Sequence, residues 1–104
     1  MARGGRLMRA LLHPLRLRII QLLSEQKLYP NQIAERLRRS RASVVYNLAI
    51  LEEAGLIEGR YEEIGEGRFA KFYHVNRAAL RKAVQELREA LEALTKSLGE
   101  CDGR

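Results

Sequence analysis

The stretch SRASVVYNLAILEEAGLI, residues 40–57, decides the fold of this chain. Ser40 is a residue type that caps helix N-termini, because its side-chain oxygen accepts a hydrogen bond from a free backbone N–H. Apolar residues then recur at helical spacing on one face: Val44, Leu48 and Leu51. Gly55 suits the end of a helix, since glycine adopts positive φ without steric cost. The stretch therefore predicts a helix from about Arg41 to Glu53 that buries only one face.

Three shorter helical patterns precede this helix. Apolar residues at helical spacing, interrupted by a proline, predict one helix ending near Leu12 and a second from about Pro14 to Glu25. In a third helix, either Asn31 is the cap or Pro30 occupies the first position. Its apolar face consists of Ile33, Ala34 and Leu37. A short turn joins this helix to the stretch above, which predicts a helix-turn-helix over residues 31–57.

Between residues 57 and 75 the apolar period changes from that of a helix to that of a strand. The turn-forming sequence Gly65-Glu66-Gly67 divides this region and predicts a β-hairpin. With Glu66 and Gly67 as the two turn residues, four cross-strand pairs follow: Gly65–Arg68, Ile64–Phe69, Glu62–Lys71 and Tyr61–Phe72. This register places an ion pair and an aromatic pair across the strands, while a longer turn is the alternative.

A long final helix is predicted from residue 77 to residue 98, after a cap at Asn76. Its apolar residues alternate steps of four and three, a seam that is typical of helices that pair with another helix. The seam consists of Leu80, Val84, Leu87, Leu91, Leu94 and Leu98. We expect it to form a homodimer interface with help from Leu7 and Leu11. Residues 99–104 are expected to form a frayed tail.

The 104 residues suffice for one domain, which we expect to span residues 1–104 with its core in residues 7–75. The formal net charge of +6 is unevenly distributed along the chain. Residues 1–41 hold 10 Lys and Arg against 2 Asp and Glu, whereas residues 42–104 hold 9 against 11. This sorting favours nucleic acid over an anionic membrane as partner. Without an apolar run of about 20 residues or a signal peptide, a cytoplasmic protein is expected rather than a membrane protein.

Several stretches resemble the ArsR-type winged-helix regulators. They are residues 13–20, Leu37, residues 40–48 and residues 51–57, within a match that covers about residues 7–98. The resemblance agrees with an α+β, mostly α fold: a winged helix-turn-helix with a tri-helical core, a two-stranded hairpin wing and a long C-terminal dimerisation helix. It further implies a homodimer in which each recognition helix, about Arg41 to Glu53, enters a major groove of DNA.

The exposed side of the recognition helix supplies the expected base contacts. A rotation of about 100° per residue places Ala42, Val45, Tyr46 and Ala49 opposite the buried face. Small residues let a helix settle into the groove, while Arg41 reaches guanine edges or phosphate and Val45 packs on a thymine methyl. Ser40 and Ser43 suit phosphates. For Tyr46 the alternative is an exposed aromatic side chain that covers neighbouring surface.

Further arginines lie around the predicted turn and in the wing. Arg36, Arg38 and Arg39 are expected to anchor phosphates, and the alternative is a solvated run of charge. Arg68 at the wing tip resembles the arginine that related wings place in the minor groove. Three carboxylates lie beside it and repel phosphates: Glu62, Glu63 and Glu66. The wing is therefore expected to be an accessory contact.

The sequence offers little for other kinds of site. Cys101 is the only cysteine, so its thiol is either incidental or links two chains on oxidation. The segment Leu28–Ile33, where ArsR-type metal sensors carry a cysteine pair, has no thiol, and the final helix has no histidine. His13 suits helix entry, and His74 suits a strand surface. We expect no metal, no cofactor and no enzymatic activity.

These features predict a sequence-specific DNA-binding transcription regulator. We expect a homodimeric repressor that reads a roughly palindromic operator, with half-sites about 10 base pairs apart. Two alternatives stay open: a winged-helix module that binds protein without touching DNA, and an architectural protein that binds any duplex. The sequence specifies neither the operator nor an effector.

Overall fold

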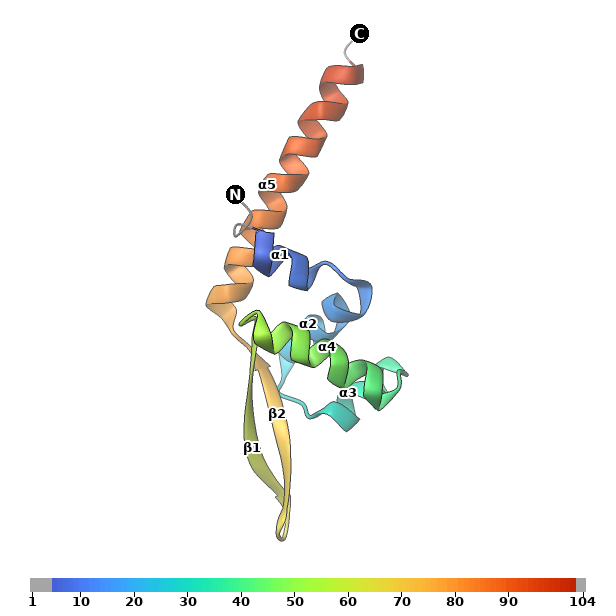
Figure 1. The fold of residues 1–104 in the computed structure, drawn as a ribbon, viewed down its shortest axis with the longest axis vertical. Coiled ribbons are helices and arrows are strands. Elements are labelled where there is room, and N and C mark those ends of the chain that lie inside the picture. The colour runs from blue at the N-terminus through green and yellow to red at the C-terminus, as the bar shows by residue number, and fades with distance from the viewer. Residues whose placement is uncertain (1–4, 103–104) are drawn as a thin grey trace.

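The computed structural model describes residues 5–102, with side chains described up to residue 99 (Figure 1). The elements follow in the order α1 (Arg6–Leu11), α2 (Pro14–Glu25), α3 (Pro30–Leu37), α4 (Arg41–Glu53), β1 (Ile57–Gly65), β2 (Arg68–Val75) and α5 (Arg77–Asp102). The two strands form one antiparallel hairpin. The predicted α+β, mostly α class and the winged helix-turn-helix arrangement are confirmed.

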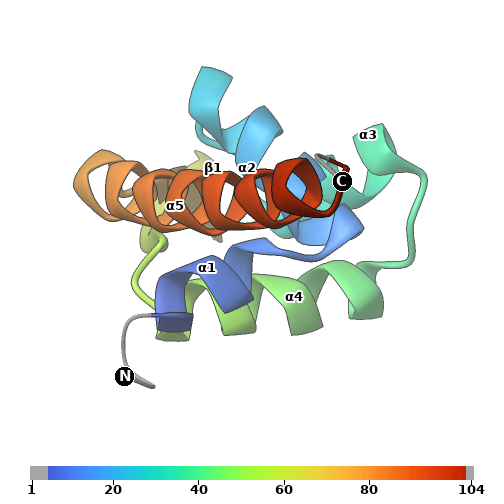
Figure 2. The same cartoon turned by 90° about the horizontal axis from the view of Figure 1, so that it is seen from above.

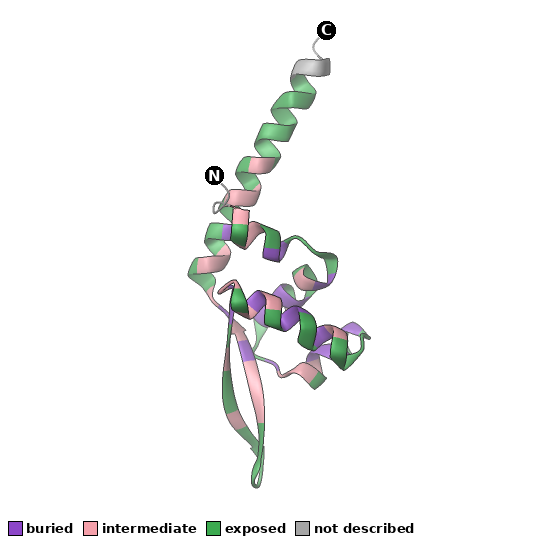
Figure 3. Cartoon of the chain, viewed as in Figure 1, coloured by how far each residue is buried: buried purple, intermediate pink, exposed green. Residues whose placement is uncertain are grey.

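An apolar core holds α2, α3 and α4 against the base of the hairpin. Large apolar side chains with at most 1% exposure come from these elements and the segments beside them: Ile19, Leu28, Ile33, Val44, Leu48, Leu51, Leu56 and Ile57. Figure 2 shows α1 between α5 and α4, and it packs against both. Burial is concentrated in this region, whereas the hairpin tip and the outer half of α5 are exposed (Figure 3). Two parts of the chain therefore project from the core.

The α2 and α3 helices both begin at a proline, with a side chain that accepts a hydrogen bond from a backbone N–H near the start. The α2 helix starts at Pro14, and Nδ1 of His13 accepts a hydrogen bond from the Leu15 N–H at 3.2 Å. The α3 helix starts at Pro30, so the prediction of Asn31 as its cap is wrong and the proline alternative is correct. Gln32 stabilises this start, because its side-chain oxygen accepts a hydrogen bond from the Tyr29 N–H at 3.1 Å.

The α4 helix has the predicted boundaries and the predicted buried face. Oγ of Ser40 accepts a hydrogen bond from the Ser43 N–H at 3.1 Å, which is the expected cap. Gly55 follows the helix at φ +85°, a conformation that side chains other than glycine rarely adopt. The inner face is closed to solvent, with Val44, Leu48 and Leu51 at most 1% exposed. The outer face of α4 is therefore open to a binding partner.

A buried polar contact that the sequence did not indicate fixes α4 against two other helices. Asn47 is 5% exposed, and its Oδ1 accepts a hydrogen bond from Arg16 at 2.9 Å. The Asn47 amide donates to the Ser43 carbonyl at 2.9 Å, and Nε of Arg16 donates to the Ala10 carbonyl. This chain of hydrogen bonds joins α1, α2 and α4. Removing one partner would leave a buried polar group unsatisfied, at a cost of about 1–3 kcal/mol.

The hairpin confirms Glu66 and Gly67 as the turn but departs from the predicted register. Gly65 pairs with Arg68 as expected, and a bulge at Ile64 then shifts the pairing. The predicted pairs Ile64–Phe69, Glu62–Lys71 and Tyr61–Phe72 are wrong; the pairs formed are Glu63–Phe69, Glu62–Ala70 and Tyr61–Lys71. A bulge inserts an extra residue into one strand, so simple alternation from the turn assigns the wrong partners.

Three side chains of the mispredicted pairs, Glu62, Lys71 and Phe72, find partners outside the hairpin. Glu62 forms an ion pair with Lys27 at 2.8 Å, and Lys71 forms one with Glu52 of α4 at 3.1 Å. The ring of Phe72 packs edge-on against Tyr29, with 5.1 Å between ring centroids. The wing is thus tied to the helical core by contacts between distant parts of the sequence.

The α5 helix is capped as predicted but is longer. Oδ1 of Asn76 accepts a hydrogen bond from the Ala79 N–H at 3.1 Å. The helix ends at Asp102, so the predicted tail from residue 99 is wrong, and residues 103–104 and the Cys101 side chain lie outside the described part. One glycine costs only about 1 kcal/mol inside a helix, which explains why Gly99 does not end it.

Among residues 5–102, no helix combines the length and apolarity that a bilayer span requires.

Candidate nucleic-acid interface

The outer face of α4 carries the predicted base-contacting residues together. Val45 is 39% exposed, Tyr46 is 67% exposed, and both alanines of this face are exposed. Those alanines are Ala42 and Ala49. Ser43 is partly buried, and its N–H and carbonyl take part in the cap and in the contact with Asn47. The helix therefore presents a low surface of small residues with one aromatic side chain, which suits entry into a groove.

The turn before α4 presents charge next to that face. Arg38 has φ +55° in the left-handed region and closes α3, and residues 38–40 form the turn to α4. Arg38, Arg39 and Arg41 are all exposed, and they flank the exposed Ser40. Guanidinium groups at this point meet the phosphates of a duplex when the following helix lies in its major groove.

Arg36 and Arg41 line different grooves. Arg36 lines a groove of about 600 Å³ between α2 and α3, together with Arg18 and Gln21. Arg41 and Arg68 lie elsewhere, along a groove of about 360 Å³ between the starts of α3 and α4 and the wing. The sequence places Arg36 close to Arg38, whereas the helical rotation of α3 turns it toward α2. Arg68 of the wing, rather than Arg36, lines the same groove as Arg41.

Asn31 is a functional candidate that the sequence analysis missed. Its Oδ1 accepts a hydrogen bond from Nε of Arg41 at 2.7 Å. Asn31 lies in the first turn of α3, and this contact fixes the direction of the Arg41 side chain at the start of α4. The only signal in the sequence is a polar residue near a helix start, which equally indicates a cap.

The carboxylates of the wing are largely occupied by internal contacts. Glu62 is paired with Lys27, and Glu63 accepts a hydrogen bond from the Gly67 N–H at 2.8 Å. Glu52 of α4 is paired with Lys71 at 3.1 Å. The repulsion of phosphates by acidic residues near Arg68 is therefore weaker than the sequence indicates, because Lys27 offsets the charge of one of the three glutamates beside it, Glu62.

The histidines have structural surroundings. His13 caps α2, and Nε2 of His74 lies 3.1 Å from a carboxylate oxygen of Glu58 on the neighbouring strand. Within the described side chains, no three His, Cys, Asp or Glu residues are grouped in a way that would hold a metal ion. Both alternatives for the Cys101 thiol, incidental or linking two chains on oxidation, concern a side chain outside the described residues.

The chain has a tri-helical core with a capped, outward-facing helix and a wing beside it. These elements define a winged helix-turn-helix protein. Comparison with known families agrees, since residues 11–60 match the family described as a helix-turn-helix domain. A search of curated proteins found no matching sequence. The family match covers α2, α3 and α4, which carry the outward face described above.

Solved structures extend the likeness to most of the chain. A possible transcriptional regulator for arsenical resistance is 27% identical, with 89% of this chain and 83% of that chain covered and a TM-score of 0.65. HlyU of Vibrio cholerae N16961 in its reduced form is 25% identical, with 89% and 88% covered and a TM-score of 0.66. An ArsR-like transcriptional regulator from Rhodococcus sp. RHA1, 22% identical, shares the fold over 98% and 92% of the chains, with a TM-score of 0.67. The chain is thus similar in sequence to a helix-turn-helix family and in structure to transcriptional regulators, which supports a DNA-binding transcription regulator.

The ion pair between Lys71 and Glu52 gives a pH-dependent prediction. The hydrogen bond to Glu52 raises the pKa of Lys71 above its ordinary value of 10.5. The pair therefore stabilises the fold below pH 10.5, and this stability is lost as the pH rises through the raised pKa. We expect Glu52→Gln to lower the free energy of unfolding by about 0.5 kcal/mol at neutral pH, since the pair is partly exposed.

Denaturant unfolding at neutral and at strongly alkaline pH measures this effect. The difference between the wild type and Glu52→Gln should shrink at the alkaline pH, whereas Glu53→Gln, on an exposed neighbour, should change stability little at either. A difference that persists unchanged where Lys71 is deprotonated would contradict the assignment.

Proposed function

We propose that the protein is a homodimeric repressor that binds a palindromic operator by inserting α4 of each subunit into the major groove. The observation that carries this proposal is the exposed outer face of α4, formed by small residues beside a cluster of arginines. A helix that is firmly packed on one side and open on the other can be held at fixed depth in a groove.

Each group of exposed residues has a chemical role in this proposal. Arg41 is suited to guanine edges or phosphate, and Val45 to a thymine methyl group. Arg38, Arg39 and the hydroxyl of Ser40 are suited to phosphates, which set the position of the helix without reading sequence. Arg36 lies on the side of α3 that faces α2, so it is the least supported member of the predicted set.

The outer half of α5 supports a homodimer. Leu91, Leu94 and Leu98 are 53%, 62% and 65% exposed and lie on one side of a helix that extends beyond the core. Leu7, Leu80 and Leu87 are partly buried and Val84 is 36% exposed, so they can extend the same surface toward the core. Leu11 is 3% exposed inside the chain's own core, so it is the least supported member of the predicted interface.

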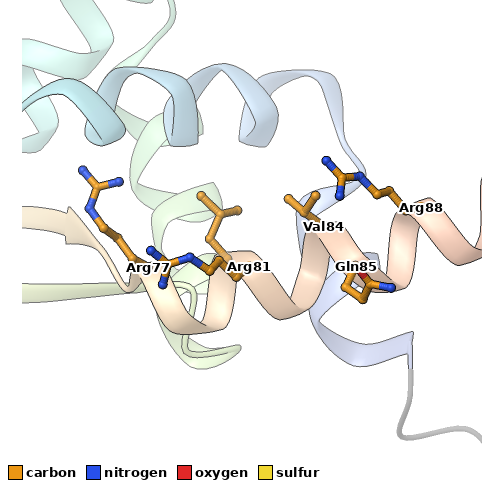
Figure 4. A pocket seen from close by; sticks show the side chains of 6 residues that line it. Arg77, Arg81, Val84, Gln85 and Arg88 are labelled. Atoms are coloured by element: carbon orange, nitrogen blue, oxygen red, sulfur yellow. The ribbon is translucent and has the colours of Figure 1, made fainter.

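A groove on the inner half of α5 continues this surface. Its volume is about 390 Å³, and Leu80 and Val84 lie between the arginines that line it. Figure 4 shows Val84 between Arg77 and Arg88 along the helix. A protein described as the homodimeric winged helix-turn-helix DNA-binding domain Mb0332 of Mycobacterium bovis shares the fold at 22% identity, with 92% and 82% of the chains covered and a TM-score of 0.63. The exposed leucines support pairing through α5, and this likeness supports a homodimer.

Two-fold symmetry links the dimer to the operator. Two identical recognition helices read two identical half-sites in opposite orientation, about 10 base pairs apart when they enter successive major grooves on one side of the duplex. Repression follows from occupying a site that a polymerase needs. A protein-binding module or a non-selective architectural protein would give different results in the DNA experiment below.

The DNA-binding face can be tested by one added charge. We select bound duplexes from a random-sequence pool and then titrate the selected site and a scrambled site. Ala49→Glu places a carboxylate on the outer face of α4 and should weaken binding to the selected site at least tenfold, about 1.4 kcal/mol. Ala78→Glu makes the same change at an exposed position of α5 and should leave binding nearly unchanged.

Three results of this experiment would contradict the proposal. Equal effects of the two substitutions would remove α4 from the interface. Wild-type protein without affinity for duplex DNA at low salt would favour the protein-binding module. Equal affinity for the selected and scrambled sites would favour an architectural protein.

The dimer interface can be tested by sedimentation. Leu91→Glu combined with Leu94→Glu should give monomers, because the two exposed leucines would be replaced by charges without disturbing the core of the chain. Lys96→Glu, at an exposed position of the same helix, is the matched control and should remain dimeric. A dimeric double variant, or a monomeric wild type, would overturn pairing through α5.

A further inference from the structure

We propose that Arg16 is a positioning residue that couples the pairing of subunits to the reading of DNA. It ties α1, which packs on the dimerisation helix α5, to the recognition helix α4. The inference rests on the proposed homodimeric DNA-binding function and assigns a role to a residue of α2 outside both proposed interfaces. We name the hydrogen-bonded set of Arg16, Asn47 and the Ala10 carbonyl the Arg16 link.

The Arg16 link joins three helices through one side chain. Nε of Arg16 donates to the Ala10 carbonyl near the end of α1, and Nη1 donates to Oδ1 of Asn47 in α4 at 2.9 Å. The two donors belong to one planar guanidinium group, whose geometry is rigid. A shift of α1 against α2 therefore changes the direction from which Asn47 is held.

The Asn47 end of the link acts on the recognition face. Asn47 is 5% exposed, and its amide donates to the Ser43 carbonyl one turn earlier in α4 at 2.9 Å. Tyr46, the residue before it, is 67% exposed on the outer face of the same helix. Because a helix turns as a rigid body, a rotation that moves Asn47 moves the outer face through the same angle.

The Ala10 end of the link reaches the proposed pairing surface. The α1 helix lies between α5 and α4 and packs against both (Figure 2). Leu7 of α1 and Leu80 of α5 are partly buried against the core and belong to that pairing surface. A second subunit on this surface therefore fixes α1 together with α5. Packed side chains and hydrogen bonds that follow one another in this way carry energetic coupling between distant sites.

A positioning role can be separated from a purely structural one. Removing Arg16 alone leaves the buried Oδ1 of Asn47 without a donor, which destabilises the fold. Replacing both residues by apolar ones of similar size removes the unsatisfied group and restores most of the stability. Apolar contacts are non-directional, so they do not restore the link. Stability and DNA reading should then respond differently to the double replacement.

A half-site duplex, which a single subunit can occupy, measures the coupling. We compare the affinity per subunit of each protein with that of its monomeric counterpart carrying Leu91→Glu and Leu94→Glu. The wild-type dimer should bind at least fivefold more tightly than its monomeric counterpart. For Arg16→Met combined with Asn47→Leu, this ratio should fall at least threefold. Arg18→Met removes an exposed arginine of the same helix and is the matched control, which should keep the wild-type ratio.

The comparison of ratios isolates the link from direct effects. Each ratio contains the same two leucine substitutions, so the effect of their added charge on DNA binding cancels between proteins. Arg16→Lys repeats the test in a chain that keeps the charge, because an ammonium group lacks the rigid plane that holds both acceptors. Its ratio should also fall at least threefold, while denaturant unfolding confirms that each variant is folded.

Two results would overturn the Arg16 link. One is a wild-type ratio of one, which would mean that pairing does not affect the reading of a half-site. The other is a folded double variant, or a folded Arg16→Lys, that keeps the wild-type ratio, since Arg16 would then have a structural role only. A wild type that is monomeric or binds no duplex overturns the proposed function itself, so the two kinds of failure are distinguishable.

Discussion

The burial of one face of α4 is the constraint on which the recognition surface depends. Val44, Leu48 and Leu51 are almost completely removed from solvent, and each buried side chain contributes about 1.5–3 kcal/mol. Hydrophobic burial is non-directional, so it sets the rotation about the helix axis only coarsely. Asn47 supplies that restraint, because its hydrogen bond to Arg16 has a defined direction and joins α4 to α1 and α2. The outer face consequently points away from the core in a fixed orientation.

The wing depends on the same helix. Lys71 of β2 pairs with Glu52 near the end of α4, and Lys27 and Tyr29 hold Glu62 and Phe72 of the hairpin. These contacts place the wing beside the start of α4 and occupy carboxylates that would otherwise repel DNA. The ion pair between Lys27 and Glu62 therefore both positions the wing and offsets the charge of one wing carboxylate.

The sequence predicts the helices well because their signals are local. Apolar spacing, Ser40, Asn76 and Gly55 each act within a few residues, and the structure confirms all of them. The pairing along the hairpin was not predictable from alternation, because the bulge at Ile64 shifts the register. The contacts between Arg16 and Asn47, and between Asn31 and Arg41, join residues that only the fold brings together. The ion pairs of the wing, Lys27–Glu62 and Lys71–Glu52, also join residues that only the fold brings together.

An NMR titration tests the central claim most directly. Backbone amide signals of nitrogen-labelled protein are recorded while duplex DNA is added. The account predicts the largest changes in residues 40–49, at Asn31 and in residues 61–69, with residues 91–98 of α5 nearly unaffected. Changes confined to α5, or to the hairpin without residues 40–49, would contradict the assignment of the outer face of α4 as the surface that reads DNA.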